Sequence, residues 1–295
     1  MALLPPVVVG PLSECSSRVR VQGQLIGATV DIFANGVHVG GGVATWSDQV
    51  FPLSGGATLA PGSNVTATQS LTGSVSPQSP APVTVQKKPP TIGHVGTKTH
   101  IYVCGQCVWL DGMVPGATVQ VTVGGALRGQ GIADDGSSRI GLSAPTGAGD
   151  TLVAQQTACG TPGPLTHLPH PDPLPGHERQ LSAPKVEGPL RACQRAVTVS
   201  NVTEGAEVDL TETPGFTETA CFDQSSLWFP TPPLSLGANV SAIQKMPGCE
   251  IQSSPSVPVP VGPSTPVPPP TVVPPLCAGD VSVRFELDPE NETGG

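Results

Sequence analysis

Apolar and polar residues alternate with a period of two along much of this chain, which is the pattern of half-buried β-strands. The clearest apolar pairs in the first third are Val19 and Val21, Val30 and Ile32, and Val65 and Ala67. Gly and Pro interrupt the alternation about every 8 to 12 residues, as turns in an all-β sandwich do. Because no window keeps a spacing of 3.6, we expect almost no helix.

One stretch recurs along the chain at a fixed spacing. Residues 27–32 (GATVDI) return as 116–121 (GATVQV) and, degraded, as 205–210 (GAEVDL), so both steps are 89 residues (116 − 27 and 205 − 116). Cys15, Cys104 and Cys193 follow the same step, and Cys277 announces a further copy. Glutamines at 69, 155 and 244 close an alternating stretch late in each copy. A fixed period of this length indicates a tandem array of one module.

The repeat divides the chain into predicted parts, with residues 5–12 as a first edge strand and residues 46–53 as part of the sheet. The parts are module 1 at 1–86, module 2 at 91–168, a Pro/His-rich linker at 169–183, module 3 at 184–262, a Pro-rich spacer at 263–275, and the start of an incomplete module 4 at 276–295.

Within the copies, the order of motifs resembles that of bacterial immunoglobulin-like repeats. The motifs are V-x-V-x-G at 19–23, P-G-A-T-V-x-V at 115–121, D-G at 135–136 and T-A-T-Q at 66–69. The resemblance covers about three copies and part of a fourth. It implies an all-β fold of tandem immunoglobulin-like β-sandwich modules in an extended array, the fourth incomplete. It says little about function, since such sandwiches host unrelated activities.

Charge and hydropathy exclude several classes of partner. The net charge of −9 over 295 residues argues against nucleic acid and anionic membrane surfaces, which both need basic patches. The sequence has no apolar run near 18 residues, so we expect no membrane insertion. Residues 1–6 do not look like a signal peptide. We therefore expect either another export route or a fragment of a longer protein, and the end inside a fourth copy favours the fragment.

The eight cysteines suggest an oxidising compartment, and hence an extracellular or cell-surface location. By module they number one, three, three and one, so pairing within modules alone leaves a thiol over in each. Cysteines 15, 104, 107 and 193 fall at one end of a sandwich, and Cys159 and Cys249 fall at the other, about 25 Å away. Because a disulfide needs Cα atoms within about 7 Å, bonds such as Cys104–Cys159 look barred.

In a head-to-tail array, however, opposite ends of consecutive modules face each other. Cys15 can then reach Cys159, while Cys104 and Cys107 can meet Cys249 and Cys221, and Cys193 awaits a partner in a completed fourth module. The hypothesis is that disulfides join consecutive modules into a stiff rod. Mixed pairing, with strands misassigned by one element, and free buried thiols are the alternatives.

Other candidate sites are weaker. Trp109 lies between Val108 and Leu110, so alternation turns it outward, where it would contact a sugar or partner or pack under a neighbouring module. The C-x-x-C at 104–107 precedes a strand rather than a helix, which disfavours redox chemistry. The D-D-G-S at 134–137 suits a hairpin turn better than calcium. The cluster of His167, His170, Asp172, His177 and Glu178 suits a solvated joint better than zinc.

The sequence carries no catalytic motif that we recognise, so we expect a non-enzymatic protein without cofactor or metal. The favoured function is a stiff spacer or fibre segment, associating with itself or with a surface glycan or protein. The alternatives are an adhesin or glycan-binding module, an accessory arm of a secreted hydrolase, and a filament subunit completed by strand donation.

Overall fold

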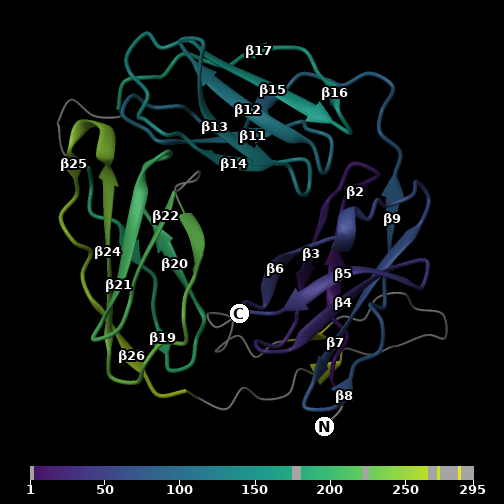
Figure 1. The fold of residues 1–295 in the computed structure, drawn as a ribbon. Coiled ribbons are helices and arrows are strands. Elements are labelled where there is room, and N and C mark those ends of the chain that lie inside the picture. Colours follow the sequence, from purple (N-terminus) through teal and green to yellow (C-terminus); the bar gives the residue numbers. More distant parts are fainter. Residues whose placement is uncertain (1–2, 175–180, 222–225, 265–270, 273–284, 287–295) are drawn as a thin grey trace. The chain divides into compact units, whose positions relative to one another are not determined.

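The computed structural model describes residues 3–174, 181–221, 226–264, 271–272 and 285–286. Among them the only helical elements are two short 3-10 turns, η1 (Ser54–Gly56) and η2 (Pro247–Cys249). The expectation of an all-β chain is therefore confirmed (Figure 1). The chain forms two compact units, Met1–Val103 with Cys107–Pro173, and Cys104–Gln106 with Leu174–Gly295.

The first module consists of two facing sheets. The smaller sheet has the order β1-β3-β6, and the larger has the order β2-β9-β7-β4-β5, with β8 paired to β7. The strands of the smaller sheet are β1 (Val7–Val9), β3 (Arg18–Gln22) and β6 (Asp48–Pro52). Those of the larger are β2 (Leu12–Ser13), β4 (Thr29–Ala34), β5 (Val37–Val43), β7 (Asn64–Leu71), β8 (Ser74–Val75) and β9 (Val83–Gln86).

The third module repeats this topology in the second unit, with sheets β18-β20-β23 and β19-β26-β24-β21-β22 and with β25 paired to β24. The strands of its smaller sheet are β18 (Lys185–Val186), β20 (Ala196–Ser200) and β23 (Ser226–Pro230). Those of its larger sheet are β19 (Leu190–Arg191), β21 (Glu207–Thr213), β22 (Thr217–Cys221), β24 (Asn239–Met246), β25 (Ile251–Gln252) and β26 (Val259–Gly262).

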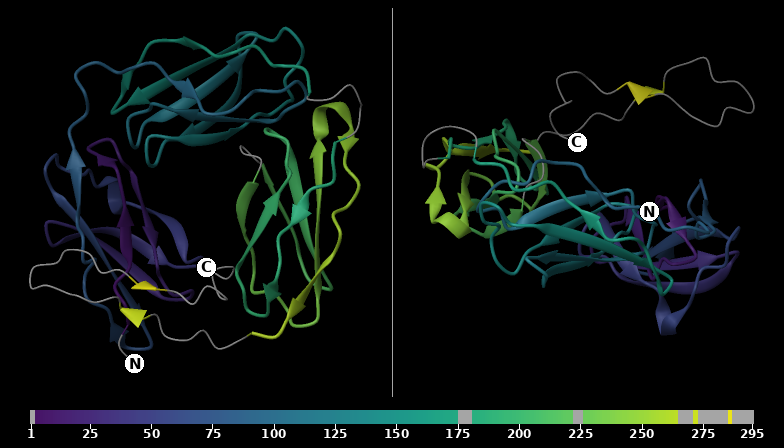
Figure 2. Two further views of the ribbon diagram at one scale, coloured as in Figure 1. Left: turned by 180° about the vertical axis from the view of Figure 1, so that it is seen from behind. Right: turned by 90° about the horizontal axis from the view of Figure 1, so that it is seen from above.

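The second module has sheets β10-β11-β14 and β13-β12-β15-β16, with β17 also on β15 (Figure 2). Its strands are β10 (Gly96–Thr97), β11 (Cys107–Asp111), β12 (Thr118–Val123), β13 (Ala126–Ile132), β14 (Ser138–Gly141), β15 (Leu152–Ala158), β16 (Thr161–Pro162) and β17 (Thr166–His167). Residue Asp172, in the stretch expected as a linker, still forms a parallel bridge with Tyr102.

The first strand of modules 1 and 3 differs from the expectation. Residues 5–12 form two short strands in different sheets, because β1 pairs antiparallel with β3 while β2 pairs parallel with β9. The change of sheet occurs at Gly10-Pro11, where the proline lacks the N–H that an uninterrupted ladder requires. Gly188-Pro189 separates β18 from β19 in the same way. Strand β6 also begins at Asp48, so Trp46 is half-buried in the preceding bend rather than in the sheet.

The apolar positions of the alternating strands form the core of each sandwich. All six residues of the pairs that define the alternation in module 1 have no exposed surface, and Phe51 and Leu59 complete the same cluster. In module 2 the corresponding cluster includes Leu110, Val119, Val121 and Ile140. Aliphatic side chains thus make up most of these two interiors, as the aromatic content of 3% leads one to expect, and Phe51 is the aromatic member.

Each module contains one buried glutamine with the same set of bonds. These residues are Gln69, Gln156 and Gln244. In each of them, Oε1 accepts a hydrogen bond from the N–H of the residue two positions before the repeated glycine. The Nε2 atom donates a hydrogen bond to a carbonyl near the start of the module. The accepted N–H groups belong to Leu25 (2.7 Å), Val114 (2.9 Å) and Thr203 (2.8 Å), and the carbonyls to Leu4 (2.8 Å), Gly93 (3.0 Å) and Ser182 (2.7 Å).

Both sets of partners are spaced by 89 residues (93 − 4 and 182 − 93; 114 − 25 and 203 − 114). We call this arrangement the glutamine clamp, because it ties the first segment of a module to the turn before its repeated strand. In module 2 the clamp residue is Gln156, not the expected Gln155. Gln156 has no exposed surface, whereas Gln155 is half-buried. The physical reason is alternation: Leu152, Ala154 and Gln156 face inward on β15.

The expected fourth module lies largely outside the described residues. Within them, β27 (Thr271–Val272) pairs antiparallel with β28 (Phe285–Glu286). The residue Cys277 falls between these strands and is not described. The incomplete fourth module therefore stays a prediction.

Candidate functional site: the junction of the first two modules

The first two modules meet within one compact unit, at two turns that carry cysteines. We call residues 13–16, which start at the last residue of β2, the early turn of module 1. Residues 159–160, after β15, are the late turn of module 2. The early turn is held by its own serines, since the N–H of Ser13 donates to Ser16 Oγ (3.1 Å) and the N–H of Cys15 donates to Ser13 Oγ (3.0 Å). The backbone around Cys15 is thus fixed before any contact with module 2.

A disulfide joins the two turns, between Cys15 and Cys159. The Cα atoms are 4.9 Å apart, although the residues are separated by 144 positions in sequence. Cys159 has a positive φ of 47°, which turns the chain immediately after β15. Cys15 also packs against a small apolar cluster of module 2, made of Ile92, Val114, Ala117 and Ala158. The structure therefore brings together the pair of cysteines that the head-to-tail hypothesis predicts.

The repeated glycine of module 2 lies directly against the early turn of module 1. Gly116 has a φ of +80°, and a Cβ atom placed on it would be 2.4 Å from the Cα and N atoms of Ser16. Beside it, the Ser13 hydroxyl donates to the carbonyl of Pro115 at 2.6 Å. Gly27, the equivalent residue of module 1, has a similar φ of +83° with nothing within 4 Å. Of these two glycines, only Gly116 therefore serves both its turn and the junction.

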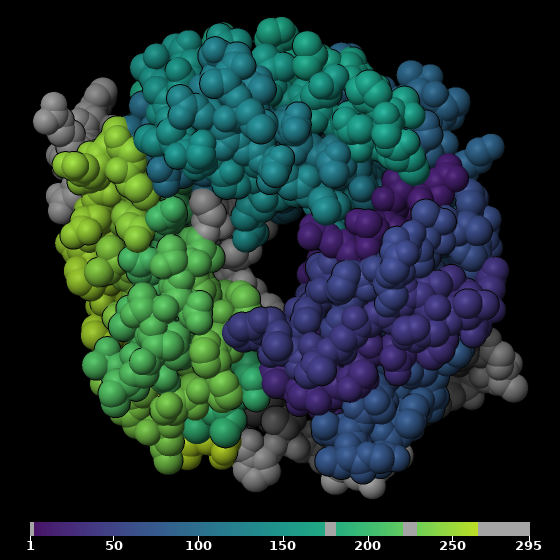
Figure 3. Space-filling model, viewed as in Figure 1, coloured from purple at the N-terminus to yellow at the C-terminus, as the bar shows by residue number. Residues whose placement is uncertain are grey.

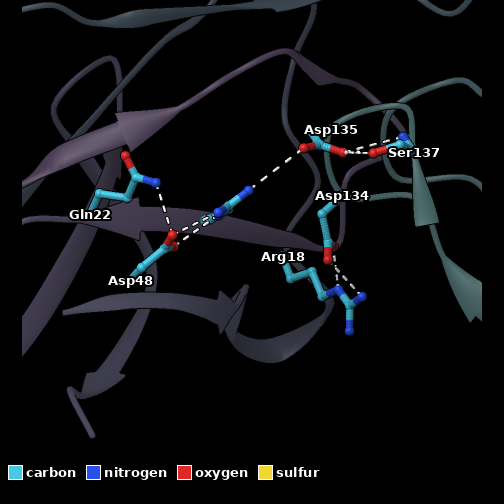
Figure 4. A network of polar contacts seen from close by, with 7 residues as sticks. Arg18, Gln22, Asp48, Asp134, Asp135 and Ser137 are labelled. Atoms are coloured by element: carbon cyan, nitrogen blue, oxygen red, sulfur yellow. Dashed lines mark hydrogen bonds and ion pairs between the residues drawn. The ribbon is translucent and has the colours of Figure 1, made fainter. Parts of the chain in front are cut away.

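Two arginines of β3 extend the junction with ion pairs (Figure 4). Arg18 forms a bidentate pair with Asp134, in which Nε donates to Oδ1 and a terminal nitrogen donates to Oδ2 at 2.8 Å. Arg20 forms a bidentate pair with Asp48 of its own module, at 2.8 and 2.6 Å, and its other terminal nitrogen lies 3.7 Å from Asp135. Residues of modules 1 and 2, purple and teal, adjoin in the space-filling view (Figure 3).

The electrostatics of this group favour its ionised form. Burial alone would raise the pKa of Asp48, but hydrogen bonds from Arg20 and Gln22 outweigh it and lower that pKa below its ordinary value. The hydrogen bond to Asp48 raises the pKa of Arg20. The arginine side chains are each 36% exposed, so water and salt screen these pairs. The ion pairs therefore orient the modules more than they stabilise them.

The D-D-G-S segment has a different role from the expected hairpin. Its flanking strands β13 and β14 pair with different neighbours, β12 and β11, so the segment connects the two sheets of module 2. Asp135 Oδ1 accepts from the N–H and the hydroxyl of Ser137, which fixes the turn and leaves Oδ2 toward Arg20. Sequence reasoning missed this contact. The available signal was two arginines at alternate positions of one strand, both outward.

The second disulfide lies in the second compact unit and joins Cys104 to Cys249, with Cα atoms 5.5 Å apart. Cys104 belongs to the loop between β10 and β11, and Cys249 to η2, after β24. Cys107 is disulfide-bonded as well. The side chain of Cys221, its expected partner, lies outside the described residues, so that pairing stays a prediction. Among the described cysteines, Cys193 is free and exposed.

Trp109 is half-buried on β11, with its ring covered on one side by a lysine. The Lys98 Nζ atom lies 4.5 Å from the ring centroid, and the Lys98 N–H donates to the Trp109 carbonyl at 3.1 Å. Alternation predicts an outward Trp109 side chain, and in the structure its ring also makes a cation–π contact with Lys98. Such a contact is worth about 0.5–1 kcal/mol at an exposed site. A sugar that stacked on this face would have to displace Lys98.

The histidines of the expected cluster are dispersed in the described part of the chain. The His170 ring bonds the Asp150 carbonyl (3.0 Å), and Asp172 lies 3.3 Å from His100, while His177 and Glu178 are outside the described residues. Within that part, no group of three His, Cys, Asp or Glu residues converges as metal ligands would. Nor does any described helix have the length and hydropathy to span a membrane.

The comparisons with known proteins return only distant likenesses to solved structures. No protein-family profile and no curated protein matches the chain. Solved structures that resemble it include a biofilm-associated protein BSP domain, at 12% identity over 90% of this chain and 67% of the other, with a TM-score of 0.26. The chicken CNTN1 FN1–FN3 domains show 10% identity over 88% and 97% of the two chains, with a TM-score of 0.23.

A third similar structure is the central fibronectin-III array of RIM-binding protein, at 11% identity over 88% and 97%, with a TM-score of 0.24. At scores this low, none of these likenesses carries an argument about activity. The sheets described above define the class of protein by themselves. The chain is a tandem array of immunoglobulin-like β-sandwich modules.

Proposed function

We propose that this chain is a structural segment of an extracellular or surface-attached protein, in which immunoglobulin-like modules of the bacterial type form a stiff spacer or fibre. The observation that carries the proposal is the junction of modules 1 and 2. There a disulfide, a buried serine hydrogen bond and an arginine–aspartate pair all connect module 1 to module 2. A non-enzymatic role fits this emphasis on junctions.

A spacer has to resist bending where its modules meet. Interfaces between domains of one chain usually permit relative motion unless they are large and apolar. Here the apolar part is small, consisting of Cys15 with the cluster around Ala117. The covalent bond supplies the restraint that burial does not, and the ion pairs fix rotation about it. The oxidised cysteines also fit an extracellular location.

The test measures the freedom of this junction in the full chain. Bioorthogonal labels at Val37 and Leu165, which are 67% and 63% exposed, report the distance between modules 1 and 2. We expect a narrow distance distribution by pulsed dipolar spectroscopy, and a broad one after Cys15→Ser with Cys159→Ser. Far-UV circular dichroism should stay unchanged, since each module keeps its own core.

The matched control is Cys193→Ser, which removes a cysteine that makes no bond in the structure. It should leave the distribution as narrow as in the native chain. A broad distribution in the native chain would contradict the stiff spacer, and equally narrow distributions in the native chain and the double serine variant would contradict the disulfide as the cause of the stiffness.

The adhesin alternative rests on Trp109 and has its own test. If the Trp109 ring contacts a glycan, Trp109→Ala abolishes binding on a glycan array, and Lys98→Ala strengthens it by uncovering the ring. If Trp109 only packs, neither change alters binding. The hypotheses of an accessory arm of a hydrolase and of a filament subunit remain predictions. The flanking coding sequence would test the first, and light scattering in solution would test the second.

A further inference from the structure

The early turn of module 3 is built like that of module 1. The N–H of Arg191 donates to Gln194 Oε1 at 3.0 Å, and the N–H of Gln194 donates to the Arg191 carbonyl at 3.2 Å. In module 1 the N–H of Ser13 donates to Ser16 Oγ, and the N–H of Ser16 donates to the Ser13 carbonyl at 3.0 Å. The positions correspond two repeats apart (191 − 13 and 194 − 16 are both 178).

The cysteines of these equivalent turns differ in their partners. Cys15 is bonded to Cys159, which follows β15. Cys104 is bonded to Cys249, which comes after β24, the equivalent long strand of module 3. Cys193, the third member of the series, is free and exposed. Its φ of +68° is close to the +72° of Cys104, so the backbone presents the two residues alike.

We infer that Cys193 is the attachment point for a further β-sandwich module, which bonds it through a late-turn cysteine. The inference rests on the proposed function, because it extends the same array by one junction. A second copy of this chain does not fit as the partner, since its late-turn cysteines, Cys159 and Cys249, are already bonded. The partner is therefore a module with an unpaired late-turn cysteine.

The new junction differs from the first in its polar contacts. The positions of Arg18 and Arg20 are occupied in module 3 by Ala196 and Thr198 (18 + 178 and 20 + 178). The β20 face thus lacks the two cations that hold Asp134 and Asp135 in the first junction. Attachment at Cys193 consequently depends on the disulfide, without a requirement for paired aspartates in the partner.

Formation of this bond needs an oxidant, for which a small-molecule disulfide suffices. The Cys193 thiolate attacks one sulfur of that disulfide, forms a mixed disulfide and releases one small thiol. The thiolate of the late-turn cysteine then attacks the Cys193 sulfur and releases the second. The two protein thiols lose two protons and two electrons, and the small disulfide is reduced to two thiols.

The experiment extends the full chain by one module. A second copy of residues 176–264 is inserted after residue 264, which preserves the 89-residue period. The inserted copy carries Cys193→Ser and Cys221→Ser, so its late-turn Cys249 is its only thiol. After oxidation with a small disulfide, peptides are mapped without reduction. The two Cys249 peptides differ in mass, because different residues follow position 264 in each.

We expect a peptide linking Cys193 to the inserted Cys249, and loss of alkylation at Cys193. The control, with the inserted Cys249→Ser as well, should restore full alkylation. Persistent alkylation of Cys193 in the extended chain would overturn the inference. So would a Cys193–Cys277 bond in the unextended chain, a measurement that does not depend on the inserted copy folding. Neither outcome affects the distance measurement at the first junction, so the two proposals fail separately.

Discussion

The interior of the modules and the turns at their ends follow different rules. Inside, the three modules are nearly interchangeable: each has a glutamine clamp whose partners keep a spacing of 89 residues. At the early turns the cysteine of the series is kept, but the residues that follow it on the next strand are not. On the strand after the turn, module 1 has Arg18 and Arg20. At the equivalent positions, module 2 has Cys107 and Trp109 (18 + 89 and 20 + 89) and module 3 has Ala196 and Thr198.

This contrast shows which constraints act locally and which act between modules. The clamp pairs a buried glutamine amide with backbone groups that every copy of the fold presents, so it recurs in every copy. A junction instead depends on what the neighbouring module offers, as Arg18 does on the carboxylate of Asp134 opposite it. Sequence variation at the module ends therefore sets the geometry of each junction without cost to the fold.

The largest effect should follow removal of a clamp. Gln156→Met leaves the buried N–H of Val114 and the carbonyl of the exposed Gly93 without their side-chain partner. The unpaired buried N–H costs about 1–3 kcal/mol, so we expect module 2 to lose about 2 kcal/mol. Hydrogen exchange of module 2 amides measures this loss without averaging over the other modules.

The neighbouring residue supplies the control for the clamp. Gln155 is half-buried and makes a single bond, from Nε2 to the Gly163 carbonyl at 2.8 Å. Gln155→Met should cost no more than about 1 kcal/mol. If the two variants lose equal stability, the clamp is not a special feature of the interior and the comparison above fails.

The next effect separates the fold from the junction at one glycine. Gly116→Ala and Gly27→Ala impose the same strain, about 1–2 kcal/mol, because both positions have a φ near +80°. Only Gly116→Ala also drives a Cβ into the backbone of Ser16. We expect faster hydrogen exchange at residues 13–16 and a broader distance distribution for Gly116→Ala alone. Equal behaviour of the two variants would mean that the contact at Ser16 does not hold the junction.

Local features of the fold were predictable from sequence. Strict alternation at Val19 and Val21 marks the inward face of β3 because side chains of a strand alternate between its two sides. The recurrence of residues 27–32 marks the module because each copy has to build the same strand. The change of sheet at Gly10-Pro11 was missed, although the proline is visible, since an edge strand tolerates proline equally well.

Features that depend on distant residues were harder to predict. Arg18 and Asp134 are 116 positions apart, and neither has a local pattern that names the other. The cysteines were an exception, because odd numbers per module and the distance between the ends of a sandwich restrict their pairing. The choice of Gln156 over Gln155 required only the register of β15, so a stricter use of alternation would have found it.

A smaller effect tests how the first junction differs from the others. A double-mutant cycle of Arg18→Ala and Asp134→Ala should give a coupling of about 0.5–1 kcal/mol, since the pair is partly exposed. The coupling should fall as salt is raised to 0.5 M, because ions screen exposed charges. A coupling that does not change with salt would assign the contact to packing rather than charge.

The smallest effect concerns the pH dependence of module 1. Because the folded pKa of Asp48 is lowered, its contribution is fully present above its unfolded pKa, about 3.9, and is lost as pH falls through the lower folded value. Asp48→Asn should therefore lose less than about 1 kcal/mol at pH 7, with screening of the exposed Arg20 included. The difference from the native chain should vanish at the acid end of the range.

Unfolding of module 1, followed by hydrogen exchange or denaturant between pH 2.5 and 7, gives the two curves to compare. Gln22→Leu is the matched control, because it removes a neutral donor to the same carboxylate while Arg20 remains. Gln22→Leu should lose part, but not all, of the pH-dependent unfolding free energy that Asp48→Asn loses. If native and Asp48→Asn chains stay parallel down to the lowest pH, the Arg20–Asp48 pair does not contribute through its charge. Arg20 would then act in the junction only through its contact with Asp135.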